Sequence, residues 1–144
     1  MNINKFNSEG YYDPTPYAAI TNITKGLKAE KKSVFKPLVY ICSPYSGDIE
    51  ENVKKARAFC RFALEMNCIP LAPHLLFPQF MNDDIPQEQE LAMFMNMVLL
   101  GKCNELWVFG DIISNGMAQE IERAKKHKQL IRYFNEKLQE VDSL

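Results

Sequence analysis

The chain has 144 residues, the usual size of a single domain. Its apolar fraction of 47% is ordinary for a packed core, and its net charge of −1 gives no electrostatic basis for binding a nucleic-acid polymer or an anionic membrane. No apolar run approaches the roughly 20 residues of a membrane-spanning helix, and the N-terminus lacks the apolar stretch of a secretory signal. We therefore expect a cytoplasmic protein.

The cysteines and histidines do not have the spacing of a metal site. The chain has four cysteines, at positions 42, 60, 68 and 103, none in a C-x-x-C pair, and its two histidines lie far apart in sequence. We expect buried free thiols, no metal and no cofactor.

Residues 1–36 are predicted to be a polar N-terminal segment carrying one helix. Asp13 can cap that helix and Pro14 suits its first turn, and apolar residues recur at roughly helical spacing from Tyr17 to Leu27. We expect this segment to be an appendage to a core domain that spans residues 37–144.

The core domain opens with a strand–loop–helix unit. Residues 38–42, LVYIC, are typical of a buried strand, and residues 43–48 form a loop of small and polar residues. An amphipathic helix is predicted from Ile49 to Met66. A short second strand follows at 68–73, where the prolines favour an edge position.

A long loop and a helix lead to the third strand. Residues 74–86 are rich in Leu, Phe and Met, and include Asp83 and Asp84, which indicates a loop that walls a pocket. A helix is predicted over 87–103. Its apolar face consists of Leu91, Phe94, Met95, Val98 and Leu99.

The stretch from Glu105 to Glu120, ELWVFGDIISNGMAQE, is a second strand–loop–helix unit. Residues 106–109 form a buried strand, Ser114 or Asn115 caps a helix, and Glu120 lies on the stripe of Met117 and Ala124. That helix is expected to end near Lys128. A last strand is predicted at 130–134, then a terminal helix or tail at 135–141.

This alternation of strands and helices predicts an α/β fold, a three-layer, flavodoxin-like or Rossmann-like domain with a mainly parallel sheet. Ligands bind such sheets at the carboxyl ends of the strands, so we expect the loops after the first and third strands to share one site. The loop carrying His74, Asp83 and Asp84 would roof it. An anion or sugar would there meet serine hydroxyls, backbone N–H groups and one carboxylate.

Each residue also has a simpler interpretation. Glu120 can be a solvated helix residue paired with Arg123, Ser114 only an N-cap, and Tyr40 a core residue. His74 can be a loop histidine making one backbone hydrogen bond. Asp83 and Asp84 can be turn formers before Pro86.

The motifs YICSPYSG, IPLAPH, CNELWVFG and SNGMAQE, in this order over about Leu38 to Phe134, resemble the nucleoside 2-deoxyribosyltransferase superfamily, in a branch of uncharacterised bacterial and phage domains. The resemblance implies that Glu120 is the nucleophile that attacks C1′ of a deoxyribose, with Tyr40 near the sugar. Ser114 matches a serine that helps to hold phosphate in the branch that hydrolyses deoxynucleoside 5′-monophosphates.

The same comparison places Asn96 where the superfamily has a second carboxylate, and Ser46 near a phosphate-binding arginine of the monophosphate hydrolases. Asn can hydrogen-bond a sugar or base but cannot act as an acid. The catalytic candidates are Glu120, Tyr40 and Asn96, and the substrate-binding candidates are Ser43, Ser46, Gly47, His74, Ser114, Gly116 and Met117.

The predicted function is cleavage or exchange of the N-glycosidic bond of a deoxynucleoside or deoxynucleoside 5′-monophosphate. The alternative is a non-catalytic module that binds a nucleotide in the same pocket. The expected partner is therefore a small nucleoside or nucleotide. Because superfamily members are oligomers whose sites borrow residues from a neighbour, we also expect a homo-oligomer, a dimer or larger.

Overall fold

The computed structural model describes residues 35–143, and the helix predicted from Asp13 to Leu27 lies outside them. The strands are β1 (Leu38–Cys42), β2 (Ile69–Leu71), β3 (Glu105–Phe109), β4 (Leu130–Phe134) and β5 (Glu140–Val141). The helices are α2 (Ile49–Glu65), α3 (Pro86–Lys102) and α4 (Asn115–Lys126), with short 3-10 turns η1 (Pro73–Leu75) and η2 (Phe77–Gln79) between β2 and α3.

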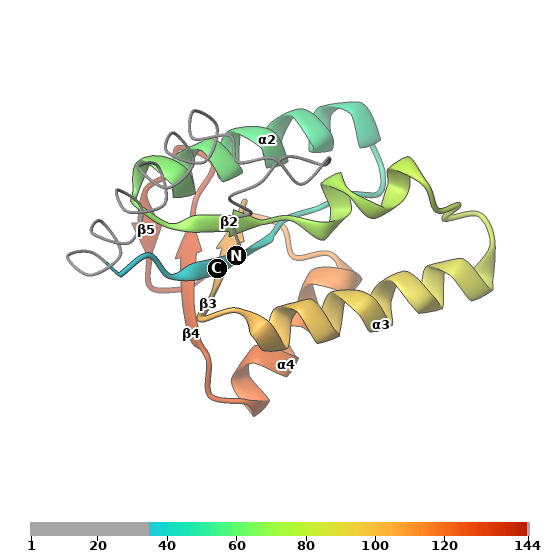
Figure 1. Cartoon of the computed structure of the whole chain (residues 1–144). Helices are drawn as coiled ribbons and strands as arrows, with labels where there is room; N and C mark the ends of the chain where they lie inside the picture. The colour runs from blue at the N-terminus through green and yellow to red at the C-terminus, as the bar shows by residue number, and fades with distance from the viewer. Residues whose placement is uncertain (1–34, 144) are drawn as a thin grey trace, which may run out of the picture. The chain divides into compact units, whose positions relative to one another are not determined.

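The strands form one sheet in the order β2-β1-β3-β4-β5, parallel except for β5. Figure 1 shows α2 on one face of this sheet and α3 and α4 on the other. The predicted three-layer α/β fold with a mainly parallel sheet is therefore confirmed. Between residues 35 and 143, no helix has the length and apolarity needed to cross a bilayer.

Alternate residues of the central strands fill the two core layers, as a sheet covered on both faces requires. Tyr40, Cys42, Leu106 and Val108 point toward α3 and α4. Val39, Ile41, Trp107 and Phe109 belong to the layer under α2. This explains why β1 and β3 are unbroken apolar runs in the sequence.

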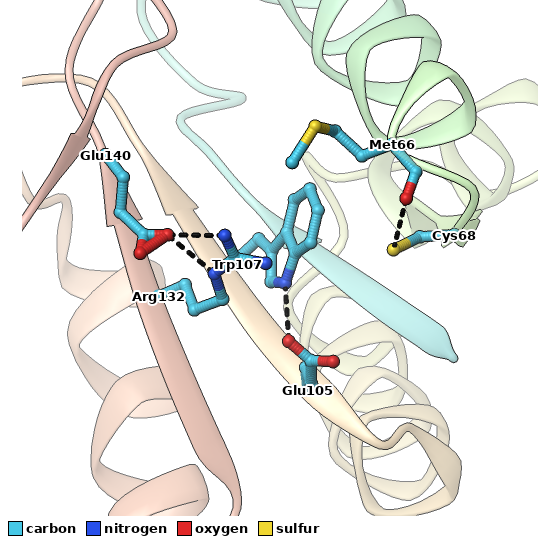
Figure 2. A network of polar contacts seen from close by, with 6 residues as sticks. All are labelled: Met66, Cys68, Glu105, Trp107, Arg132 and Glu140. Atoms are coloured by element: carbon cyan, nitrogen blue, oxygen red, sulfur yellow. Dashed lines mark hydrogen bonds and ion pairs between the residues drawn. The ribbon is translucent and has the colours of Figure 1, made fainter. Parts of the chain in front are cut away.

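Trp107 is fully buried yet keeps its polar atom satisfied (Figure 2). Its indole N–H donates to Glu105 Oε1 at 3.1 Å, and the Arg132 guanidinium lies 4.8 Å from its ring centroid. Arg132, its neighbour in the β3–β4 register, is in turn held by Glu140 of β5 at 2.6 Å. The network therefore ties the last strand to the centre of the sheet.

The prediction of a helix or tail at 135–141 is wrong. The side-chain oxygen of Asn135 accepts the N–H groups of Lys137 and Gln139, and Leu138 has a positive φ of 61°. This tight turn sends the chain back as β5, antiparallel to β4. The positions of three cysteines also differ slightly from the prediction. Cys68 precedes β2 instead of lying in a strand, Cys103 caps α3, and Cys60 is only half-buried.

Candidate active site

A cavity of about 560 Å³ opens at the carboxyl ends of β1 and β3. These strands are direct neighbours, with Tyr40 beside Leu106 and Cys42 beside Val108, so the loops that follow them meet at one edge, as predicted. Every predicted site residue except Gly47 lines this cavity. They are Tyr40, Ser43, Ser46, His74, Asn96, Ser114, Gly116, Met117 and Glu120.

Gly47 serves the first loop in another way. It is exposed, has a φ of +96°, and accepts the N–H of Ile49 through its carbonyl, so it makes the turn into α2. The loop is fixed further by Asn52, whose side-chain amide donates to the carbonyls of Tyr45 and Ser46.

Glu120 is buried, with 8% of its surface exposed, in the wall that α4 contributes. The buried Tyr40 hydroxyl donates a hydrogen bond to its carboxylate. Burial raises the pKa of Glu120 from 4.5 to about 7, while the Tyr40 hydrogen bond acts in the opposite direction. The pKa of Tyr40 is raised far above its ordinary value, first by burial and then by the Glu120 charge, so this tyrosine stays protonated and acts as a donor.

The interpretation of Glu120 as a solvated partner of Arg123 is therefore wrong. The Arg123 side chain donates to the Met97 carbonyl of α3 at 3.1 Å and contacts His127 at 3.2 Å. Arg123 thus ties α4 to α3 one turn beyond the cavity. Tyr40 is a core residue as well as a site residue, since its ring is buried and its hydroxyl reaches the carboxylate.

The first turn of α4 follows the loop after β3 and lines the cavity. Ser114 is the N-cap, and its hydroxyl accepts the N–H of Met117 at 3.3 Å. Gly116 faces α3 closely, because a Cβ added to it would lie 3.6 Å from Met93 Cε. Met117 is buried, and its carbonyl accepts the Cys42 thiol.

Ser43, in the loop after β1, and His74, in η1 after β2, form a polar pair that lines the cavity. The Ser43 hydroxyl lies 3.0 Å from His74 Nε2, and Ser43 is buried. Burial lowers the pKa of His74 from 6.5 to about 4, so the imidazole is neutral near pH 7. Tyr45 packs edge-on against the same ring. His74 is therefore anchored by a side chain, whereas the simpler interpretation gave it one backbone hydrogen bond.

Sequence reasoning missed part of the wall that α3 contributes. Gln89, Met93 and Asn96 line the cavity at i, i+4 and i+7, a helical spacing that could have indicated a shared face. The predicted apolar face of this helix is only partly a core face. Leu99 packs against the core, whereas Leu91, Phe94 and Val98 are 50%, 65% and 43% exposed.

The cavity is acidic. Asp83, Glu90 and Glu120 line it, and among residues 35–143 no lysine or arginine does. Asp84 lies outside the lining, and its N–H bonds to the side chain of Asn82 in a turn, so only Asp83 of this pair reaches the site.

Two solved structures show that this mainly parallel sheet, with its cavity at the carboxyl ends of the strands, is an α/β fold of the nucleoside 2-deoxyribosyltransferase-like class. Its fold is similar to that of the 2-deoxyribosyltransferase of the psychrotolerant bacterium Bacillus psychrosaccharolyticus, with a TM-score of 0.53 and 14% identity over 67% of this chain and 71% of that one. It is also similar to the 2-deoxyribosyltransferase of Leishmania mexicana, with a TM-score of 0.52 and 12% identity over 69% of this chain and 64% of that one.

The chain belongs to the family described as a domain of unknown function, DUF7768, whose match spans residues 37–134. That range runs from just before β1 to the end of β4 and includes every cavity residue named above. Among curated proteins, none matches this sequence.

Proposed function

We propose that the chain cleaves or exchanges the N-glycosidic bond of a 2′-deoxynucleoside or its 5′-monophosphate, with Glu120 as nucleophile. The observation that carries the proposal is a buried carboxylate, hydrogen-bonded by Tyr40, in the wall of a nucleoside-sized cavity. Structural buried glutamates are usually paired with a cation, whereas this one has a neutral phenol as partner. A carboxylate that no cation neutralises keeps its charge available for nucleophilic attack.

The chemistry follows the double displacement of a retaining glycosidase. An ionised Glu120 oxygen bonds to C1′ as the C1′–N bond breaks and its electron pair leaves with the base. A second base, through a ring nitrogen, or water then bonds to C1′, and the bond from C1′ to the carboxylate breaks. The departing base takes a proton from solvent, and the attacking N–H or O–H group releases one to solvent. A pKa near 7 leaves a substantial ionised fraction at neutral pH, and the Tyr40 hydroxyl stabilises the anion that attacks and is re-formed.

The remaining candidates have binding roles in this proposal. Ser43, Ser46, Ser114 and the backbone of Gly116 and Met117 contact the sugar and any phosphate from the loops after β1 and β3. His74 holds Ser43 in place. Asn96 takes the place of an acid but can only hydrogen-bond, so it orients the ligand.

One observation favours the alternative, a nucleotide-binding module without chemistry. Asn96 cannot protonate a departing base, and among residues 35–143 no cation lines the cavity. In that case the pocket binds its ligand and leaves it intact.

The experiment is incubation with a panel of deoxynucleosides and their 5′-monophosphates, with free base measured by chromatography. We expect base from at least one of them and a loss of at least about a thousandfold in Glu120→Ala. Glu122→Ala, which removes an exposed carboxylate from the same helix, is the matched control and should keep the activity. If no compound releases its base but one of them raises the melting temperature, the catalytic proposal is wrong and the chain is a nucleotide-binding module. A ligand present at about 100 times its Kd raises the free energy of unfolding by about 2.7 kcal/mol.

We also propose that the chain forms a homo-oligomer through α3. Leu91, Phe94 and Val98 form an exposed apolar stripe at i, i+3 and i+7, and these side chains would be buried by a second copy. Figure 1 shows the start of α3 extending beyond the sheet. The cytoplasmic location and the division at residue 36 stay predictions.

A further inference from the structure

The carboxylates of the cavity extend from its interior to its opening. Glu120 is buried in the wall, whereas Asp83 and Glu90 are exposed and therefore lie toward the opening. Asp83 precedes α3 and Glu90 lies near the start of that helix, so the negative charge comes from separate elements. Among residues 35–143, no lysine or arginine lines the cavity to offset it. The cavity therefore attracts a ligand that is positively charged.

Aromatic side chains lie beside these carboxylates. Tyr45 and Phe77 both line the cavity, and the Tyr45 ring lies edge-on to His74, with 6.5 Å between the ring centroids. Burial and then the charge of Asp83 raise the pKa of Tyr45, so Asp83 acts on this tyrosine from a different loop. Because the face of an aromatic ring attracts a cation, a flat positively charged group is favoured here by its shape as well as by its charge.

The uncharged polar side chains of the cavity do not supply an acid for a departing base. Asn96 is an amide and has no acidic proton. Burial lowers the pKa of His74 to about 4, so its imidazole is neutral near pH 7 and cannot act as the acid. The pKa of Tyr40 is raised far above its ordinary value, so this phenol holds its proton. A neutral base leaves C1′ with a negative charge unless an acid protonates it, whereas a positively charged base leaves as a neutral molecule.

We propose that the base of the substrate carries a fixed positive charge, as an N-alkylated purine or a pyridinium ring does. The inference rests on the proposed function, since Glu120 remains the nucleophile. As an oxygen of Glu120 bonds to C1′, the C1′–N bond breaks and its electron pair neutralises the positive ring nitrogen. Water then bonds to C1′, the bond from C1′ to the carboxylate breaks, and one proton passes to solvent. Such a substrate needs no acid from the protein.

A positively charged base also prepares the nucleophile. The pKa of Glu120 is about 7, so roughly half of this group is protonated near pH 7. A positive charge bound beside it favours the carboxylate, and binding therefore releases that proton. Tyr40 and Cys42 of β1 interact with the Glu120 charge but stay protonated, because burial raises the pKa of both, and His74 is already neutral. The released proton then comes from Glu120.

The first test measures base release, above the spontaneous rate, from nicotinamide 2′-deoxyriboside, 7-methyl-2′-deoxyguanosine and neutral 2′-deoxyguanosine. We expect release from at least one of the two cations and its loss in Glu120→Ala. Asp83→Asn should lower kcat/KM for that cation about threefold at low salt, and Asp83→Asn with Glu90→Gln about tenfold, with smaller effects at high salt. Asp84→Asn, which removes an equal charge just outside the cavity lining, is the matched control for Asp83→Asn and should have a smaller effect.

The second test measures binding by calorimetry with two carbocyclic 2′-deoxynucleoside analogues that cannot be cleaved, one with the nicotinamide ring and one with the uncharged benzamide ring. We expect tighter binding of the nicotinamide analogue, with release of about half a proton at pH 7, measured in buffers of different ionisation enthalpy. Glu120→Gln should abolish the proton release.

The outcomes separate the two proposals. Equal binding of the two analogues, or base release from 2′-deoxyguanosine but from neither cation, would overturn the inference and leave the proposed function. Tighter binding of the charged analogue without base release from any nucleoside would overturn the proposed catalysis and leave the inferred charge of the ligand. No binding and no release would overturn both.

Discussion

Replacing Glu120 by glutamine should change how the stability of the protein depends on pH. The pKa of Glu120 rises from 4.5 in the unfolded chain to about 7 in the folded protein, because burial disfavours the charged form. The folded state therefore holds this proton more tightly, and the wild-type protein loses stability as pH rises from about 4.5 to about 7. At roughly 1.4 kcal/mol per pKa unit, the loss is about 3 kcal/mol.

The measurement is urea unfolding of both proteins at several pH values between 4 and 8. The free energy of unfolding of Glu120→Gln, minus that of the wild type, should increase by about 3 kcal/mol across this range. His74 acts in the opposite sense, since its lowered pKa of about 4 makes the folded state gain stability as pH rises, but it is present in both proteins and cancels in the difference. Glu122→Gln, which removes an exposed carboxylate from the same helix, is the matched control. A difference for Glu120→Gln that is flat with pH would refute a buried, ionisable Glu120.

Three further predictions concern the walls of the cavity and the outer face of α3. Tyr40→Phe removes the hydroxyl that lowers the pKa of Glu120, so the rise of kcat/KM with pH should move to higher pH, and an unmoved profile would contradict the hydrogen bond. Ser46→Arg adds a cation to an acidic cavity and should tighten binding of a deoxynucleoside 5′-monophosphate by roughly tenfold or more in calorimetry, with no gain for the unphosphorylated nucleoside. Phe94→Glu should shift sedimentation toward the monomer, because it places a charge within the apolar stripe, and an unchanged oligomer would exclude that face.

The strands and helices of the core could be predicted because each follows from a local pattern. β1 and β3 are apolar runs with both faces buried, and α2 and α4 have one apolar stripe each and an Asp or Ser cap. Their order alone makes β1 and β3 candidates for neighbours, which brings the two functional loops together. The placement of nearly all candidate residues around one cavity follows from this topology.

Other features depend on contacts that a local pattern does not contain. α3 is apolar on almost every side, so its sequence could not distinguish the face toward the cavity from the face with Leu91, Phe94 and Val98. The turn at Asn135 depends on side-chain bonds to the backbone two and four residues on, which a polar segment of this length does not reveal. The hydrogen-bond partner of Glu120, Tyr40, is a residue 80 positions away in the sequence.

Three polar groups of the cavity do not suit a buried position. Glu120 is a carboxyl with a raised pKa, Asn96 has an oxygen without a donor, and His74 is held neutral by burial, and all three line the same cavity. Trp107 and Arg132, by contrast, have carboxylate partners in Glu105 and Glu140. Local conflicts of this kind are expected where a ligand binds. Glutamine or methionine at residue 120 would avoid the cost of burying a charge, so the presence of a carboxyl there argues for chemistry that an amide or a thioether cannot perform.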